Sequence, residues 1–480
     1  MRSFLRRRRR TAGCAEAVTG MDFRCAVCSN SMLQSGSRPF SFLSLPAMSW
    51  FTSVGALLAA AVASSALDAQ GQNPINLWSV PLTSSGGRLI AGNPVKLTHD
   101  DGINSQPSFT PDGRAIVFSA TRDTGSTARS EIYRYHFATG RESRVTRTPE
   151  NENSPTVNSR GEYMAVRWVP ATLFREYGPW VYAPDGKPRR GVLPGADTTG
   201  YYTPVGSGRY ILTRPKSRTF TVAMFDSAAG AIVDLDSGVP ALPAQRIPRY
   251  TAISYVVLDS ASARHELRRY DLVTRRRTSL GRTVPGRTTH AWLPNGGTVL
   301  MAKGSTLYAR RAGATGRDTA WSVVATFSTP ELRHASAYAI SPDGTRLIMT
   351  SPKRPPLAVV VRDSLESGRS AIDITPVVLA WRAAGRLGDY DVNEGALSAL
   401  GDVWLGRRLM SDAVALHSLN ADLFPSSHRA AGRLGDAQAA AGDRTGAAVS
   451  YRRALTLNPR ATDDDRKVAN TIDQRLKELR

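Results

Sequence analysis

The sequence contains very little cysteine. Only three of its 480 residues are cysteine, Cys14, Cys25 and Cys28, and none follows position 28. Such a chain has no disulfide framework, so its stability must come from domains large enough to bury a core. The Cys25-x-x-Cys28 pair has no second pair and no histidine at ligand spacing. It therefore does not indicate a metal or redox site.

Recognisable catalytic motifs are also lacking. The sequence has no Gly-x-Ser-x-Gly elbow, no phosphate-binding glycine loop, no His-Glu-x-x-His pair and no EF-hand spacing. Its seven histidines are scattered along the sequence. A metal site in the propeller channel would require His290 and His334 to lie close together. A turn histidine or a hydrogen-bonded surface histidine is the favoured interpretation of both. The sequence thus predicts no catalytic residue, no metal ligand and no cofactor.

Acidic residues are scarce relative to basic ones. Lysine and arginine total 62 against 40 aspartates and glutamates, which gives a formal net charge of +22. Part of the surplus is the run Arg6–Arg10, and the rest is spread along the chain. A basic surface favours binding to an acidic protein partner or to a membrane surface. The alternative is that the arginines are only solvated surface residues without a partner. Nucleic acid is not expected, because no aromatic stacking platform accompanies the arginine runs.

What the sequence does contain is a repeated phrase. Gln106–Ser119 reads as a strand, an Asp-Gly turn and a second strand, and Ala337–Thr350 repeats it. Asp112 and Asp343 belong first to these turns, with a calcium role as the alternative. Weaker copies begin at Asn153, Thr199, Arg249 and Thr289.

The phrases recur at about the spacing of a propeller blade, which consumes roughly 40 to 50 residues. Further hairpins are expected between them, over Glu131–Thr146, Phe220–Leu235, Leu267–Leu280, Leu307–Phe327 and Leu357–Ile374. Six copies predict a six-bladed β-propeller, and the hairpin at Leu357–Ile374 leaves seven blades open. We expect an N-terminal strand at Asn76–Leu82 to join the last blade, which would remove exposed sheet edges.

The Ser/Thr-Pro-Asp-Gly phrases resemble the WD40-like, or PD40, repeats of the TolB family over about residues 75 to 376. This resemblance implies a TolB-like propeller, a location in the cell envelope and docking of other proteins. TolB carries its second domain at the N-terminus, whereas this chain has a different one at the C-terminus. The partners of TolB are therefore not carried over.

The C-terminal region has a different period. Four positions have counterparts 34 residues later. Leu400-Gly401, Trp404, Ala413 and Pro425 correspond in this order to Leu434-Gly435, Gln438, Ala447 and Pro459. This period and pattern resemble the tetratricopeptide (TPR) repeat, which implies helical hairpins and a groove for a partner. The first copy departs from the family because Arg407-Arg408 stands where a turn glycine is expected. The groove residues predicted here are Trp404, Arg407, Arg408 and Gln438.

The N-terminus shows features of processing. Residues 1–47 have no strand or helix period and are interpreted as a mis-assigned or disordered extension. Residues 48–69 are apolar and end in small residues, as a secretory signal peptide does, and a retained membrane anchor is the alternative. The predicted domains are then a propeller over 70–376 and a TPR-like helical domain over 377–480.

These observations predict a secreted or periplasmic scaffold without catalytic activity. One alternative is an enzyme that uses a metal or carboxylate cluster at the propeller channel. Another is a binder of carbohydrate or small ligands, for which Tyr177, Trp180, Tyr201 and Tyr202 would have to gather on one face. A core role is favoured for most of these aromatic residues.

Overall fold

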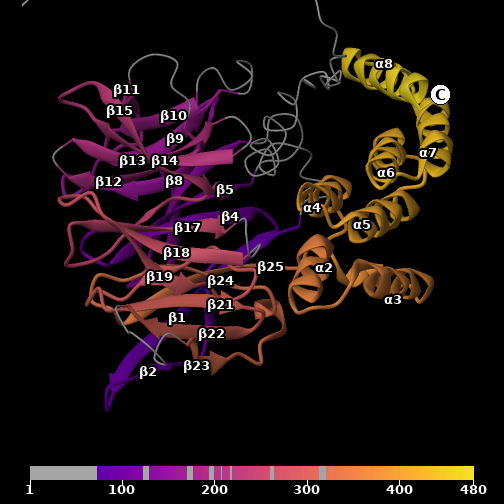
Figure 1. The fold of residues 1–480 in the computed structure, drawn as a ribbon. Coiled ribbons are helices and arrows are strands. Elements are labelled where there is room, and N and C mark those ends of the chain that lie inside the picture. The colour runs from indigo at the N-terminus through magenta and orange to yellow at the C-terminus, as the bar shows by residue number, and fades with distance from the viewer. Residues whose placement is uncertain are drawn as a thin grey trace, which may run out of the picture. The chain divides into compact units, whose positions relative to one another are not determined.

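The computed structural model describes residues 73–122, 129–169, 177–193, 199–206, 208–216, 219–259, 264–312 and 320–479. The predicted extension and signal peptide lie outside these residues. The described chain consists of β-strands as far as Pro352 and of helices from Leu357 onward (Figure 1). Within these ranges, no helix has the length and apolar character needed to cross a membrane.

Most strands belong to antiparallel sheets of four consecutive strands. In each sheet the strands lie side by side in chain order, which is the up-and-down order of a propeller blade. The first of the four separate sheets contains β8 (Asn151–Val157), β9 (Tyr163–Trp168), β10 (Tyr177–Tyr182) and β11 (Pro188–Gly191), and the second contains β12 (Tyr201–Gly206), β13 (Arg209–Lys216), β14 (Thr219–Asp226) and β15 (Ala231–Val239). The third contains β16 (Gln245–Arg246), β17 (Ala252–Asp259), β18 (Arg264–Asp271) and β19 (Arg277–Arg282). The fourth contains β20 (Ala291–Trp292), β21 (Thr298–Lys303), β22 (Thr306–Arg311) and β23 (Ser322–Thr326).

A fifth, nine-stranded sheet joins the two ends of the β region. It contains β1 (Ile75–Ser85), β2 (Arg88–Ala91), β3 (Val95–Lys96), β4 (Ile103–Phe109), β5 (Ala115–Thr121), β6 (Ser130–His136), β7 (Arg141–Arg144), β24 (Ser336–Ile340) and β25 (Arg346–Pro352). Strand β1 pairs antiparallel with β25, from Ile75 opposite Pro352 to Pro81 opposite Arg346. The N-terminal strand thus joins the strands of the last repeat, as the sequence predicted.

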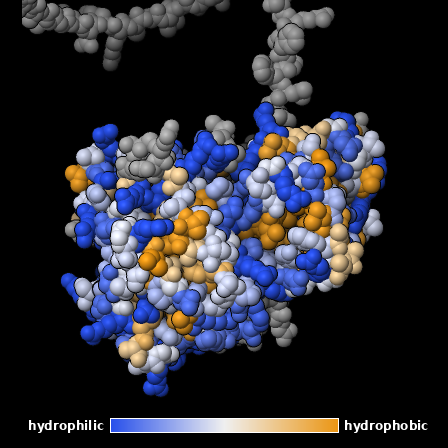
Figure 2. Space-filling view, turned by 90° about the horizontal axis from the view of Figure 1, so that it is seen from below, coloured by the Kyte–Doolittle hydropathy of each residue, from blue (hydrophilic) through white to orange (hydrophobic). Residues whose placement is uncertain are grey.

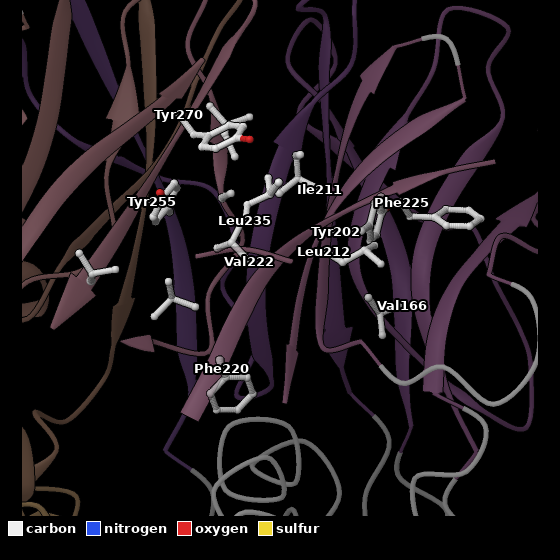
Figure 3. Packing of buried hydrophobic residues seen from close by; sticks show 14 of the residues in the cluster. Val166, Tyr202, Ile211, Leu212, Phe220, Val222, Phe225, Leu235, Tyr255 and Tyr270 are labelled. Atoms are coloured by element: carbon white, nitrogen blue, oxygen red, sulfur yellow. The ribbon is translucent and has the colours of Figure 1, made fainter. Parts of the chain in front are cut away.

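Apolar side chains from neighbouring sheets share one core. Val166 of β9 packs in the same cluster as Ile211 of β13 and Ile253 of β17, although these residues belong to three different sheets. Figure 3 shows side chains of this cluster, among them Tyr202, Phe220 and Tyr255. Because each sheet is twisted and narrow, it buries both faces only when a neighbour covers it.

The repeated phrase forms the predicted turn. The Asp112 carboxylate accepts hydrogen bonds from Thr110 Oγ1 at 2.5 Å and from the Arg114 amide at 3.1 Å, while Gly113 has a φ of 68°. These hydrogen bonds lower the pKa of Asp112, with the Thr110 hydroxyl contributing most. Asp343 is held by Ser341 and Thr345 in the same way. The predicted turn role of both aspartates is confirmed.

The weaker copy predicted to begin at Arg249, which has no glycine for its turn, is displaced from its predicted position. Ile253 lies in β17, the second strand of its hairpin, and the first strand is the short β16 at Gln245–Arg246. The turn between them is closed by a hydrogen bond from the Tyr250 amide to the Ile247 carbonyl, and Arg249 has a φ of 66°. Arg249 therefore adopts the left-handed conformation that elsewhere favours glycine.

The predicted hairpin over Leu357–Ile374 is wrong, because this segment is helical. Leu357, Val361 and Leu365 are buried and four residues apart, so they form one apolar face of a helix. The β-branched run Val359–Val361 had suggested a strand. The observation that favoured a seventh blade is thereby removed, and the predicted domain boundary at Pro376 falls inside a helix.

The helices form successive antiparallel hairpins. They are α2 (Leu357–Glu366), α3 (Ala371–Ala383), α4 (Glu394–Gly406), α5 (Met410–Leu423), α6 (His428–Ala440), α7 (Arg444–Leu457) and α8 (Asp463–Glu478), with a short 3-10 helix η6 (Arg386–Asp389). Helices α4 and α6 begin at Glu394 and His428, and α5 and α7 begin at Met410 and Arg444. Both steps are 34 residues, so the sequence period is also the period of the helices.

One contact is repeated in both hairpins. A methyl group at Gly401 would lie 2.6 Å from the His417 ring, and one at Gly435 would lie 2.6 Å from the Tyr451 ring. The next residue contacts the same ring in each case, because Asp402 lies 3.3 Å from His417 Nε2 and Asp436 accepts a 2.8 Å hydrogen bond from Tyr451. The glycines let the rings pack directly on the backbone of the first helix.

The two hairpins differ at the turn. Gly442 in the second turn has a φ of 86°, and Arg408 has a φ of 60° at the equivalent place in the first. Both turns are closed alike, by hydrogen bonds from the Leu409 amide to the Trp404 carbonyl and from the Asp443 amide to the Gln438 carbonyl. The arginine therefore accepts a left-handed backbone that costs about 1 kcal/mol.

Replacement of Gly435 by alanine should destabilise the helical region by about 1 to 3 kcal/mol, because the added methyl overpacks against the Tyr451 ring. Gly406→Ala is the matched control, since no atom lies within 4 Å of the added methyl. It should stabilise the protein slightly through helix propensity. Urea denaturation followed by helical circular dichroism measures both; equal midpoints for the two variants would contradict this packing.

Replacement of Arg408 by glycine should raise the stability of the helical region by about 0.5 to 1 kcal/mol, because it relieves the left-handed strain. Gly442→Arg should lower stability by a similar amount. Thermal unfolding monitored at 222 nm compares the two variants with the unaltered chain. A destabilised Arg408→Gly protein would show that the arginine side chain contributes more than its strain costs.

Candidate functional site

The four predicted groove residues differ in exposure. Trp404 is 4% exposed and belongs to the core of the helical region, and the Arg407 guanidinium lies over its ring at 4.5 Å. Gln438 of α6 accepts a 2.6 Å hydrogen bond from Ser450 of α7. Of the four residues, only Arg408 is exposed, and it lies at the first turn.

His290 is part of a buried hydrogen-bond network. Its Nε2 lies 2.7 Å from the Ser254 hydroxyl, which also accepts a 2.8 Å hydrogen bond from Trp292 Nε1. His290 is 3% exposed and Ser254 is fully buried. Burial lowers the pKa of His290 to about 4. This pair joins two neighbouring sheets, and His290 is hydrogen-bonded but buried, so it is not the surface histidine that the sequence predicted.

His334 has different surroundings from His290. It lines a cleft between the β region and the first helices, and its charged neighbours are Arg287, Arg333, Arg362 and Asp363. Burial, followed by Arg287, lowers the pKa of His334 to about 4. Across the ranges that the structure describes, no three His, Cys, Asp or Glu side chains are grouped so that they could hold a metal ion.

The aromatic residues considered for ligand binding lie mostly in the core. Tyr177, Tyr201 and Tyr202 are 4 to 5% exposed, which confirms the core role for these three. Trp180 is half-buried, and the Arg167 guanidinium covers its ring at 4.2 Å. These four residues do not offer an aromatic face to a sugar.

His334 lines a cleft that we call the junction cleft. Its volume is about 770 Å³. One wall comes from the β region, at Lys303, the 3-10 helix η5 (Pro330–Leu332), Arg333 and Lys353. The other comes from α2 and η6, and includes Val360, Asp363, Ser364, Arg386 and Tyr390. Sequence reasoning missed this cleft, because segments far apart in the chain supply its walls and none has a motif.

An ion pair holds the two walls of the junction cleft together. The Arg287 guanidinium, in the loop between β19 and β20, bonds the Asp363 carboxylate of α2, and Arg362 lies 3.3 Å from the same carboxylate. Arg287 and Asp363 are 12% and 18% exposed. A partly desolvated pair of this kind fixes geometry, and removal of one partner would leave an uncompensated charge.

Two buried carboxyl groups lie in the β region. Glu131 and Glu152 are 1% and 0% exposed. Glu131 accepts hydrogen bonds from Arg144 at 2.7 Å and from the Thr148 amide, while Glu152 is bonded by the Thr148 hydroxyl and by Tyr182 at 3.3 Å. Burial, with Glu131 nearby, raises the pKa of Glu152 well above its usual range.

The chain is similar to known proteins in structure and not in sequence. No family model matches it, and no curated protein does so either. Among solved structures, the putative TolB from Agrobacterium tumefaciens shares 12% identity and covers 59% of this chain and 99% of its own, with a TM-score of 0.43. TolB from Acinetobacter baumannii shares 15% identity, with coverages of 58% and 63% and a TM-score of 0.33.

An oligogalacturonate lyase from Vibrio parahaemolyticus is similar to the same extent. It shares 11% identity and covers 55% of this chain and 83% of its own, with a TM-score of 0.36. Two of these three neighbours are TolB proteins, the family that the Pro-Asp-Gly phrases resemble, and the third is an enzyme. Identity and TM-score are low in every case, so no activity or partner is taken from them.

The raised pKa of Glu152 should make stability depend on pH. The folded state holds this proton more tightly than the unfolded state, so stability is greatest in acid and decreases as the pH rises from the ordinary carboxyl pKa towards the raised native one. Glu152→Gln, which does not titrate, should gain about 1 to 3 kcal/mol over the unaltered chain at pH 9 and nothing at pH 4.

Urea denaturation at both pH values tests this prediction. Glu478→Gln, at an exposed position near the end of α8, is the control and should leave the pH profile unchanged. A Glu152→Gln protein with the same pH profile as the unaltered chain would show that Glu152 is ionised in the folded protein.

Proposed function

We propose that this protein is a non-catalytic interaction scaffold of the cell envelope or of the secreted fraction. In this proposal the β region is a TolB-like propeller of six blades, and the helices are TPR-like hairpins that dock a protein partner. The observation that carries the proposal is the repeated helical unit, in which the helix starts and the glycine–ring contact both recur after 34 residues. Repeated helical hairpins provide an extended binding surface.

The exposed turn between α4 and α5 supports a partner site. Val403 and Leu409 are 44% and 45% exposed, and Arg408 lies beside Leu409 in the same turn. We call Val403, Arg408 and Leu409 the turn patch. Figure 2 shows hydrophobic residues gathered on the visible face of the helical region among hydrophilic ones. Arginine with exposed aliphatic side chains is typical of interface centres, and the basic charge favours an acidic partner.

The proposed location rests on the N-terminal sequence. The apolar segment 48–69 has the features of a signal peptide, and the chain has no cysteine after Cys28 that would need oxidative pairing. Partners would then be envelope or secreted proteins, with a membrane surface as a further contact and without nucleic acid.

A second candidate function is the binding of a small ligand. The junction cleft favours it, because a volume of about 770 Å³ lies within the range of ligand pockets, roughly 300 to 1,000 Å³. This candidate does not exclude the first, since the turn patch and the junction cleft have different residues.

The scaffold proposal is tested with the full chain. We expect Arg408→Glu combined with Leu409→Asp to reduce crosslinking to envelope proteins about tenfold, because it reverses the charge of the turn patch and removes its apolar side chain. Leu409 is the N-cap residue of α5 and makes no side-chain capping bond, so aspartate there favours the helix.

The matched control is Val449→Asp combined with Arg452→Glu on α7, where both residues are exposed. Quantitative mass spectrometry of crosslinked species compares the two variants with the unaltered chain. Species lost only from the turn-patch variant support the proposal. The same species captured by all three proteins, or by none, would contradict docking at this turn.

A further inference from the structure

The lining of the junction cleft has a small surplus of positive charge. Lys303, Arg333, Lys353 and Arg386 line it, against Glu331, Asp363 and Asp389. Arg287, Arg362 and Arg407 do not line the cleft, but they act on His334, which lines it, or on Glu366 of α2.

The carboxyl groups do not offset this surplus. Asp363 is already bonded to Arg287, with Arg362 at 3.3 Å. Burial raises the pKa of Glu366, which favours its neutral form. The loop at Gly286 is packed so closely that a methyl group there would lie 2.1 Å from Glu366 Oε2. The cations therefore remain in excess within a partly desolvated space.

His334, which lines the cleft, has a buried ring nitrogen, Nδ1, that makes no hydrogen bond. Among the residues that the structure describes, Arg287 Nε, Arg362 Nε, Arg407 Nε and the acceptor Glu366 Oε2 are also buried without a partner, but these residues do not line the cleft. Buried polar groups almost always have a partner, so the unpaired His334 nitrogen indicates that a partner is missing in the cleft. An oxyanion is the acceptor that arginine and imidazole donors bind most strongly.

Two neutral histidines flank the same charges. The pKa of His334 and that of His265 are both lowered to about 4, first by burial and then by neighbouring arginines, which are Arg287 for His334 and Arg407 for His265. Arg362 acts on both rings, and Asp363 opposes the shift of His334. A bound anion would offset these arginines and raise both values.

Part of the cleft lining is apolar. The Tyr390 ring is stacked on Trp381, with ring centres 5.0 Å apart and an interplanar angle of 3°. Pro330, Pro355 and Val360 line the same cleft. A ligand of this cleft would therefore combine an anionic head with an apolar body.

We propose that the junction cleft binds a small organic acid or phosphate ester, with its oxyanion against Lys303, Arg333 and His334 and its apolar body against Tyr390. The shared chemistry is an oxyanion attached to a non-polar group. This inference is independent of docking at the turn patch, so either can fail without the other.

Four probes of related shape test the proposal on the full chain by isothermal titration calorimetry at constant ionic strength. Phenyl phosphate and phenylacetate carry the two oxyanions, benzyl alcohol is the neutral analogue, and inorganic phosphate lacks the apolar body. We expect saturable binding of phenyl phosphate or phenylacetate, and at least about tenfold weaker binding of the other two. The tighter of the two aromatic anions identifies the head group as phosphate or carboxylate.

Arg333→Gln and Lys303→Gln should each weaken this binding about tenfold, because each removes one cationic donor from the oxyanion. Neither side chain belongs to an ion pair described above, so folding should be retained, and circular dichroism checks this. Arg276→Gln, at an exposed position in the turn between β18 and β19, is the matched control, and its affinity for the probe should be unchanged.

A second readout separates binding at this place from binding elsewhere. The His334 ring, followed by NMR, should titrate at higher pH when the anion is present, because the anion favours the imidazolium. Three results would each overturn the proposal. They are equal binding of benzyl alcohol and the aromatic anions, loss of anion binding in sodium chloride at constant ionic strength, and unchanged affinity for the anion in Arg333→Gln and Lys303→Gln.

Discussion

The pairing of β1 with β25 is the interaction on which the rest of the structure depends. It joins the first and last strands of the β region, from Ile75 opposite Pro352 to Pro81 opposite Arg346. Without it, each of the two strands would lose its pairing along one edge, and open edges invite aggregation. The same junction continues into Asn73, whose side chain donates to the Arg354 carbonyl and accepts from the Arg354 amide at 2.9 Å.

The pairing of β1 with β25 also decides where the helices begin. The chain leaves the sheet at Pro352, is held by a hydrogen bond from the Lys353 amide to the Pro74 carbonyl, and enters α2 at Leu357. Arg287 then holds α2 through Asp363. The junction cleft exists because these contacts fix one helix beside the β region, and the charges that surround it are a consequence of the same packing.

Much of the fold could be predicted from local residue patterns. The Asp-Gly turns at Asp112 and Asp343 and the 34-residue helical period are properties of short segments, so propensity and spacing are sufficient to predict them. Predictions were wrong where long-range packing outweighed propensity. The segment after Leu357 contains a run of valines and is nevertheless a helix, because Leu357, Val361 and Leu365 bury one face against the neighbouring helices. Arg249 and Arg408 adopt glycine-like conformations for the same reason.

The sequence by itself determined the repeat, the turns, the basic charge and the 34-residue helical period, because each depends on residues close together in the chain. Only the tertiary structure decided that Trp404 is a core residue, that His290 bonds Ser254 and that His334 lies near Arg287, Arg333 and Arg362. The candidate cleft belongs to this second group. Its charges come from segments that no local pattern connects, and they act on one another only after folding brings them within a few ångströms in a desolvated space.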